Sequence, residues 1–453
     1  WGFPNKMGAN GGFPFLILYL ALALCCGVII MLGELALGRK TGHGAVGAYQ
    51  SISKRFKWLG WLGIAAAALI FSFYSALGGY CLRYVVVNFG NLIGAEFGTN
   101  GVGGADVFQG LLSQPDVSIA FALAFMLITM LVVMSGVGGG IERVCSVGMP
   151  ALFFILIICI IRSCTLPGAV DGLKYMFVPG WAVANGIIDE APGFWRVLTA
   201  AGGQMFFSLS LGAGVMITYG SYLDKKQDLG KSAMIIVGMD TVVALMAGLC
   251  VIPGRFALDP NGALGGPELL FITMQNVFDK MGPAGPVFGI LFYLLVFFAA
   301  ISSSISMLEV IVAHFCDKAR EKGKGDRRKL YSAIAVVICA ALCALVCADG
   351  MGSNHISPAE LLGLAGAKLP GWSTSWLGLF DSVAEGLLMP LGALLMCLMI
   401  SWELKPDALR QEILLNGENR PWVYDFFRLC VKYITPLCML MILYGQISDF
   451  FIA

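Results

Sequence analysis

The chain has 453 residues, of which 58% are hydrophobic and only 13% are charged. A soluble globular domain is roughly one-quarter charged and under one-half apolar, so this composition excludes a soluble enzyme, a disordered protein and a nucleic-acid-binding protein. The 29 Lys and Arg residues nearly balance the 28 Asp and Glu residues, so the net charge indicates no acidic partner. An all-α polytopic membrane protein remains. A β-barrel is excluded because apolar runs such as 13–32 do not alternate with polar residues.

A membrane-spanning helix needs about 20 mostly apolar residues. Ten such segments follow the first residues, at 12–37, 58–89, 117–135, 145–163, 195–222, 232–252, 285–316, 329–348, 376–402 and 425–449. Residues 1–10 indicate the end of one more helix, which predicts eleven spans in a single transmembrane domain, 1–453. The chain begins at Trp1 rather than at Met, and we expect part of the first helix to precede it.

The positive charges predict the orientation, because Lys and Arg gather in cytoplasmic loops. Most of the 29 Lys and Arg residues fall in alternate loops, above all in 38–57, 318–329 and 405–432. We therefore place these loops inside, and the last span then leaves the C-terminus outside. On the outer side, segments 263–282 and 356–367 are expected to form short amphipathic lid helices.

One predicted span carries two serines and two glycines near its middle, in Ser208-Leu-Ser210-Leu-Gly212-Ala-Gly214. Glycine weakens a helix by about 1 kcal/mol at each position. An unwound segment in mid-membrane would expose carbonyl groups for a cation and N–H groups for an anion. The alternative is a continuous helix whose small residues pack against a neighbour.

The span 285–316 holds four serines in five residues, at Ser302, Ser303, Ser304 and Ser306. Hydroxyl and carbonyl oxygens suit a hard cation such as Na⁺. The alternative is that these hydroxyls donate hydrogen bonds to the preceding turn of their own helix.

Among the carboxylates inside predicted spans, where an unpaired charge costs at least about 2.5 kcal/mol, three are considered as possible cation ligands. They are Glu34, Asp240 and Glu309. Asp240 carries the most weight for a cation site, although it could lie in water at the interface. Glu34 could pair with Arg39, and Glu309 could face water on the inside. Tyr74, in mid-span, needs a partner for its hydroxyl group, which a substrate carboxylate or the backbone could supply.

Six sets of short strings occur in the order typical of one family. They are Gly2-Phe-Pro4 with Asn10-Gly-Gly12, Glu34-Leu-Ala-Leu-Gly-Arg39, Ser72-Phe-Tyr-Ser75, Gly140-Ile-Glu-Arg143 with Met149-Pro150, Gln204-Met-Phe-Phe-Ser-Leu-Ser210, and Ala299-Ala-Ile-Ser-Ser-Ser304. Each string is weak alone, but together they cover nearly the whole chain. They resemble the neurotransmitter:sodium symporter family, in its bacterial amino-acid-transporting branch.

The resemblance implies a leucine-transporter-like fold of two inverted five-helix repeats, with helices one and six broken at mid-membrane. The first repeat would span about 1–163 and the second about 195–402, followed by an extra helix at about 425–449. It also implies sodium-coupled symport of a neutral, hydrophobic or aromatic amino acid into the cell by alternating access. The protein would lie in the inner (plasma) membrane, with the bilayer, sodium ions and an amino acid as partners and no nucleic acid.

Position by position, the resemblance also implies roles for individual residues. Substrate-binding residues would be Ile70, Tyr74, Phe207, Ser208, Ser210, Ala213, Ser303 and Met307. Ser208 and Asp240 would bind a first Na⁺, and the Ala299 carbonyl, Ser302 and Ser303 a second. Gln204 resembles an outer-gate residue, Tyr222 and Asp317 resemble inner-gate residues, and Glu34 would support the unwound part of the sixth helix.

Two positions depart from the family pattern. Gly2 stands where the family usually has Arg, and our alignment puts Ala384 where the Asp partner of that Arg usually stands, with Asp381 and Glu385 close by. The usual ion pair of the outer gate is therefore not expected. Ala213 stands where relatives often carry Phe, and the smaller side chain should leave room for a larger substrate.

Asp240 also bears on chloride, because animal relatives hold an uncharged Asn there and bind Cl⁻ nearby. A fixed carboxylate would repel chloride and replace its charge, so we expect sodium dependence without chloride.

Two alternatives stay open: a proton-coupled transporter with Glu34, Glu309 or Asp240 as the proton carrier, and a non-transporting receptor or channel. An enzyme is not expected, because no nucleophile elbow, metal cluster or phosphate loop lies inside the spans.

Overall fold

The computed structural model describes residues 2–323, 325, 327–363, 371–404, 406–414 and 421–451. Every regular element within these residues is a helix, which confirms the all-α prediction. Trp1 and residues 364–367 of the second predicted lid segment lie outside the described residues.

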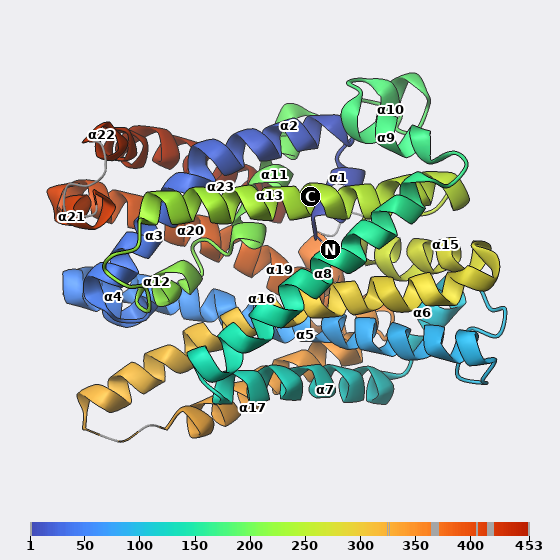
Figure 1. Ribbon diagram of the computed structural model, residues 1–453, viewed down its shortest axis with the longest axis horizontal. Coiled ribbons are helices and arrows are strands. Elements are labelled where there is room, and N and C mark those ends of the chain that lie inside the picture. The colour runs from blue at the N-terminus through green and yellow to red at the C-terminus, as the bar shows by residue number, and fades with distance from the viewer. Residues whose placement is uncertain are drawn as a thin grey trace.

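The helices fall into two sets, before and after a break at residue 210 (Figure 1). The first set is α1 (Gly2–Ala9), α2 (Phe13–Leu22), α3 (Val28–Thr41), α4 (Ala45–Ile52), α5 (Lys57–Ile93), α6 (Gly104–Leu112), α7 (Pro115–Met134), α8 (Glu142–Cys164), α9 (Ala169–Phe177), α10 (Trp181–Ala184) and α11 (Phe194–Leu209). The second set is α12 (Val215–Gly220), α13 (Leu229–Leu258), α14 (Gly266–Glu268), α15 (Met274–Lys280), α16 (Gly285–Glu321), α17 (Arg328–Asp349), α18 (Pro358–Leu361), α19 (Trp376–Asp381), α20 (Met389–Leu398), α21 (Arg410–Ile413), α22 (Pro421–Leu429) and α23 (Thr435–Phe451).

Nine helices among the described residues are long and apolar enough to span a membrane. They correspond to nine of the ten predicted segments, and the tenth, 195–222, is the broken pair α11 and α12. Helix α1 supplies the expected short first element. Figure 1 places α6, α9, α10 and α15 at one end of the bundle and α4, α21 and α22 at the other. We name these the outer end and the inner end, following the predicted orientation.

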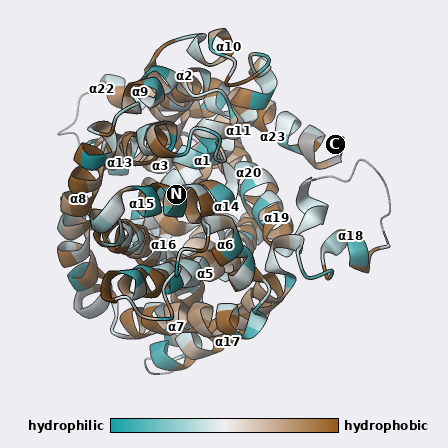
Figure 2. Ribbon diagram, turned by 90° about the vertical axis from the view of Figure 1, so that its right-hand side faces the viewer, coloured by the Kyte–Doolittle hydropathy of each residue, from teal (hydrophilic) through white to brown (hydrophobic). Residues whose placement is uncertain are grey.

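The long helices α5 and α16 pack against each other and form the centre of the bundle. Figure 2 looks onto the outer end and shows the first residues of the chain near the middle, enclosed by the other helices. Large apolar side chains face outward around the bundle, among them Phe154, Ile161 and Val337. Surfaces of this kind suit contact with lipid rather than with water.

The sixth span is unwound where the serine and glycine pattern predicted it. Helix α11 ends at Leu209 and α12 begins at Val215. Between them Ser210, Gly212 and Gly214 adopt left-handed backbone conformations, with φ of 53°, 76° and 73°. A Cβ atom on Gly212 would lie 2.1 Å from the carbonyl oxygen of Met389. The glycines therefore allow the helix to break here. They do not form the packing face of a continuous helix.

We predict that Gly212→Ala destabilises the folded protein by at least about 1–3 kcal/mol. Alanine must adopt a left-handed backbone there, and its Cβ meets the Met389 carbonyl. The thermal unfolding midpoint of the purified protein measures the effect. Gly238→Ala, on α13 and with no atom within 4 Å of the added Cβ, is the matched control and should keep or raise the midpoint. Equal midpoints for the two variants would contradict the prediction.

Candidate functional site

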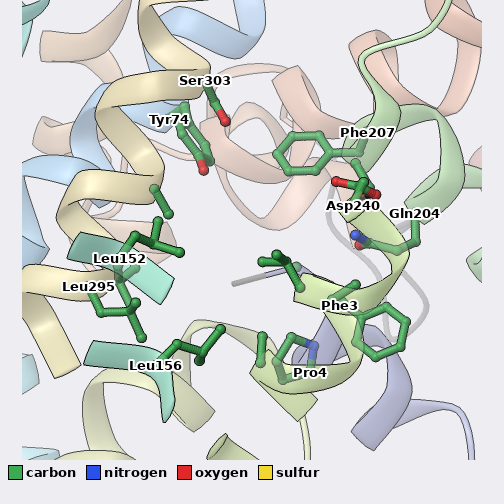
Figure 3. A pocket seen from close by; sticks show the side chains of 17 residues that line it. Phe3, Pro4, Tyr74, Leu152, Leu156, Gln204, Phe207, Asp240, Leu295 and Ser303 are labelled. Carbon is green, nitrogen blue, oxygen red and sulfur yellow. Dashed lines mark hydrogen bonds between the residues drawn. The ribbon is translucent and has the colours of Figure 1, made fainter. Parts of the chain in front are cut away.

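A cavity of about 190 Å³ lies beside the helix break (Figure 3). Its walls come from α1, α5, α8, α11, α13 and α16. The lining residues are Gly2, Phe3, Pro4, Tyr74, Leu152, Leu156, Gln204, Phe207, Ser208, Asp240, Val243, Ala244, Ala247, Leu295, Val296, Ala299 and Ser303. The cavity therefore has both polar and apolar walls. The polar groups come from α5, α11, α13 and α16, and the apolar side chains come from α1, α8, α13 and α16.

Tyr74 and Phe207 both line this cavity and contact each other. Their ring centroids lie 5.9 Å apart with an interplanar angle of 63°, which is an edge-to-face arrangement. Figure 3 shows the Ser303 side chain beside the Tyr74 ring, with the Phe207 ring on the other side of Ser303. The predicted carboxylate-binding tyrosine and the predicted aromatic lid are thus brought together by α5 and the last turn of α11.

Asp240 lies near the middle of α13 and lines the cavity. Its Oδ2 atom accepts hydrogen bonds from the Ser208 hydroxyl at 2.7 Å and from the Tyr19 hydroxyl at 3.2 Å. Within the described residues no hydrogen bond reaches Oδ1. A half-buried carboxylate with one oxygen still available suits a hard cation that takes oxygen ligands, so the predicted first sodium pair fits. The role of Asp240 as a sodium ligand stays a prediction.

Sequence reasoning missed Tyr19, on α2. Its side chain is fully buried, and its hydroxyl meets Asp240 across 221 positions of the sequence. The available signal was the one used for Tyr74, namely a tyrosine inside an apolar run that needs a hydroxyl partner.

The predicted second sodium residues share one stretch of α16. The Ser302 hydroxyl donates to the Ala299 carbonyl at 2.8 Å, and the Ser306 hydroxyl donates to the Ser302 carbonyl at 3.2 Å. These serines therefore do bond back to their own helix, as the alternative stated. Ala299 and Ser303 nevertheless line the cavity, and the buried Ser304 hydroxyl has no partner within the described residues. The oxygen atoms needed for a second cation lie close together.

The other predicted substrate-binding residues lie behind the cavity wall. Ile70, Ala213 and Met307 are buried, and Ser210 is one of the left-handed residues of the break. None of the four is among the residues that line the cavity as described here. Their roles stay predictions.

Glu34 supports the break as the resemblance implied. Its Oε1 atom accepts a hydrogen bond of 2.6 Å from the backbone N–H of Gly212. The alternative pairing with Arg39 is wrong, because the Arg39 Nε atom donates to Glu412 on α21 at 2.8 Å. Burial alone would raise the pKa of Glu412, yet the hydrogen bonds from Lys225 and Arg39 hold the pKa below its usual range.

An ion pair does occur at the outer side of the cavity, although the sequence analysis did not expect the usual one. The Lys6 ammonium group on α1 contacts the Glu385 carboxylate in the π-helical segment Ser382–Leu388. Asp381 lies one turn before Glu385, and both line a second cavity together with Lys6 and Gln204. Ala384 is fully buried and carries no charge.

Two hydrogen bonds on the inner side join α12 and the turn that follows it to α16. The Tyr219 hydroxyl lies 2.9 Å from the Ser306 hydroxyl, and the Tyr222 hydroxyl donates to Glu309 at 2.7 Å. Arg328 donates to both oxygens of Glu309, at 2.6 and 2.9 Å. Glu309 is fully buried, so the water-facing alternative for this residue is wrong.

Asp317, the other predicted inner-gate residue, accepts a hydrogen bond from the Gly44 N–H at 2.9 Å. It therefore joins α16 to the turn before α4, at the inner end of the bundle. Both inner-gate residues named from the sequence thus make contacts between helices at this end.

A bundle of spanning helices with a cavity at a helix break is the architecture of a secondary transporter. A sequence model of the sodium:neurotransmitter symporter family matches residues 1–100 and 105–451. The chain belongs to this family, whose members are sodium-coupled transporters and not enzymes.

Individual relatives agree with this assignment. The uncharacterized sodium-dependent transporter YhdH of Bacillus subtilis (strain 168) is 35% identical over 99% of this chain and 93% of its own length. The sodium-dependent nutrient amino acid transporter 1 of Drosophila mojavensis is 26% identical over 70% of this chain and 57% of its own.

A solved structure supports the fold. The crystal structure of MhsT in complex with L-phenylalanine has a TM-score of 0.83 and 32% identity, and the match covers 98% of this chain and 94% of that one. The predicted leucine-transporter-like fold is confirmed.

We predict that Arg328→Gln lowers the thermal unfolding midpoint, because it leaves the buried Glu309 carboxylate without its cation. Breaking one side of a buried ion pair costs about 3–5 kcal/mol. Arg327→Gln, at an exposed neighbouring position, is the matched control and should leave the midpoint unchanged. Adding Glu309→Gln to Arg328→Gln should restore part of the loss. A double variant no more stable than Arg328→Gln alone would contradict the pairing.

Proposed function

We propose that this chain carries a neutral, hydrophobic or aromatic amino acid into the cell together with sodium, by alternating access across the plasma membrane. The observation that carries the proposal is the cavity at the helix break, where Tyr74, Phe207, Ser208, Asp240 and Ser303 meet. Apolar walls from α8, α13 and α16 suit an apolar side chain. The MhsT complex with L-phenylalanine supports the same substrate class for a related protein.

In this mechanism each cavity residue has a separate role in binding the substrate or a sodium ion. Tyr74 donates its hydroxyl hydrogen to the substrate carboxylate, and Phe207 covers the bound substrate. Asp240 and Ser208 bind the first sodium ion. The Ala299 carbonyl, Ser302 and Ser303 bind the second, and Gln204 borders the outer entrance. Opening of the contacts that α12 and its following turn make at the inner end would release sodium and substrate inward.

We also propose that transport is independent of chloride. The hydroxyl groups of Tyr19 and Ser208 converge on one oxygen of Asp240, as two donors would on a bound anion. The fixed carboxylate supplies the negative charge at this place and would repel a chloride ion.

A proton-coupled transporter is the second candidate, with Glu34, Glu309 or Asp240 as the carrier. Glu309 is held by both terminal nitrogens of Arg328, and Glu34 by the N–H of Gly212. Neither of these two carboxylates lines the cavity, and the oxygen atoms around Asp240 suit sodium. A substrate-binding receptor or channel without uptake is the third candidate.

Radiolabelled uptake into proteoliposomes that contain the full-length protein tests these candidates. Tryptophan, tyrosine and leucine would each be offered under an inward sodium gradient, under a proton gradient and under neither. We expect uptake with sodium only, and faster for the larger side chains. Uptake driven by protons alone would move the function to the second candidate. Specific binding without uptake under any gradient would favour the receptor.

We predict that Tyr74→Phe weakens substrate binding about 10- to 100-fold, because a hydrogen bond to a charged group contributes about 1.5–3 kcal/mol. Scintillation proximity binding of tritiated tryptophan in sodium measures the change. Tyr80→Phe is the matched control on the same helix, since the Tyr80 hydroxyl is buried and has no partner within the described residues. Equal affinities in the two variants would remove Tyr74 from the substrate site.

We predict that Asp240→Asn abolishes uptake in chloride-free buffer or makes it depend on chloride, because the neutral amide removes the fixed negative charge beside Tyr19 and Ser208. Uptake would be compared in chloride and in gluconate at constant sodium. Full chloride-free activity of this variant would show that the Asp240 charge has no such role.

A further inference from the structure

A second cavity of about 260 Å³ lies on the outer side of the central one. It is lined by Gly2, Asn5, Lys6, Ala9, Asn10, Gln204, Phe207, Gly266, Pro267, Leu377, Asp381 and Glu385. We name it the outer vestibule. Gly2, Gln204 and Phe207 belong to both cavities, so the two spaces meet at these residues. A substrate that enters from outside must pass this junction.

Lys6 reaches across the vestibule to Glu385. Lys6 stands on the short helix α1, and Glu385 in the π-helical segment between α19 and α20. The Lys6 side chain is 30% exposed, whereas that of Glu385 is only 6% exposed. A carboxylate so poorly hydrated needs a cation, so this contact holds α1 against the helix that carries Glu385.

Gly2 and Lys6 lie on the same face of α1, and Gly2 is packed closely against Gln204. A Cβ atom on Gly2 would lie 2.7 Å from the side-chain oxygen of Gln204, so a larger side chain does not fit there as Gln204 stands. Residues four apart on a helix share one face, which places Lys6 one turn further out on the face of Gly2. The long lysine side chain, on the same face, then reaches Glu385 across the vestibule.

The remaining polar groups of the vestibule leave Lys6 a second acceptor. Asp381 lies one turn before Glu385 and lines the same space. The amide group of Asn5 is buried and has no partner within the described residues, and the same holds for the Gln204 oxygen. Two carboxylates and two side-chain amides with unpartnered atoms therefore line the cavity that Lys6 also lines.

We infer that the Lys6–Glu385 pair is the outer latch of this transporter. When the pair is formed, it holds α1 against the Ser382–Leu388 segment and closes the path that leads from the vestibule past Phe207 to Tyr74. When the outer side opens, Lys6 leaves Glu385, and Asp381 remains within the same space to accept it. The inference rests on the proposed function, because a latch has meaning only for a site that opens to the outside.

Chemical modification of a cysteine behind the latch tests the inference without requiring transport. Val243→Cys places a thiol in the central cavity and not in the vestibule. A membrane-impermeant methanethiosulfonate reagent would be added outside whole cells, and the chain without Val243→Cys corrects for its 14 native cysteines. We expect Lys6→Gln and Glu385→Gln each to raise the modification rate several-fold.

Charge-conserving and distant variants make the test specific. With Lys6→Arg, the thiol of Val243→Cys should be modified as fast as in the parent protein. The exchange of Lys6→Glu with Glu385→Lys should bring the modification rate back toward that of the parent. Lys280→Gln removes a lysine of the exposed outer pair with Asp259 and should change nothing. Single variants that modify at the parent rate, or an exchange variant as fast as the singles, would overturn the latch. Failure of uptake together with the expected modification rates would instead count against the proposed function alone.

Discussion

The unwound segment between α11 and α12 is the constraint on which the rest of the structure depends. In the interior of a bilayer no water reaches an exposed backbone N–H group, and each unsatisfied group costs free energy. Glu34 meets this need by accepting a hydrogen bond from Gly212. The absence of a side chain on Gly212 lets the segment lie against the carbonyl of Met389. A buried carboxylate and a glycine far apart in sequence thus make one break possible.

The break also sets what each half of the helix can contact. Phe207 and Ser208 lie in the last turn of α11 and face the cavity. Tyr219, on α12, meets the Ser306 hydroxyl, which in turn donates to the Ser302 carbonyl. Two hydrogen bonds therefore connect a predicted sodium ligand to the inner half of the broken helix. If Ser302 bound a different partner, the change could affect the position of α12 through the hydroxyl groups of Ser306 and Tyr219.

The sequence allowed the spans and the break to be predicted, because both depend on local composition. Apolar length identifies a spanning helix, and two serines with two glycines identify the unwound turn between Ser208 and Gly214. Tyr74 and Phe207 were identified within short family strings, and Asp240 as a carboxylate inside a predicted span. The structure brings all three to one cavity. Pairings between distant segments were not accessible in this way. Lys6 and Glu385 lie 379 positions apart. The position that corresponds to the family's usual outer-gate Asp is the neighbouring Ala384, so this pair was not expected from the sequence.

The carboxylates inside the bundle differ in which groups neutralise them, and this difference supports the proposed sodium site. Glu309 faces Arg328, and Glu385 faces Lys6. Glu34 receives a backbone N–H at the break and does not line the cavity. Asp240 lines the cavity, yet only the hydroxyl groups of Tyr19 and Ser208 donate to it. Hydroxyl donors orient a carboxylate but supply no full positive charge, so Asp240 presents a negative charge to the cavity that no cation within the described residues offsets, as Lys6 and Arg328 do for Glu385 and Glu309. This contrast supports the proposed sodium site at Asp240.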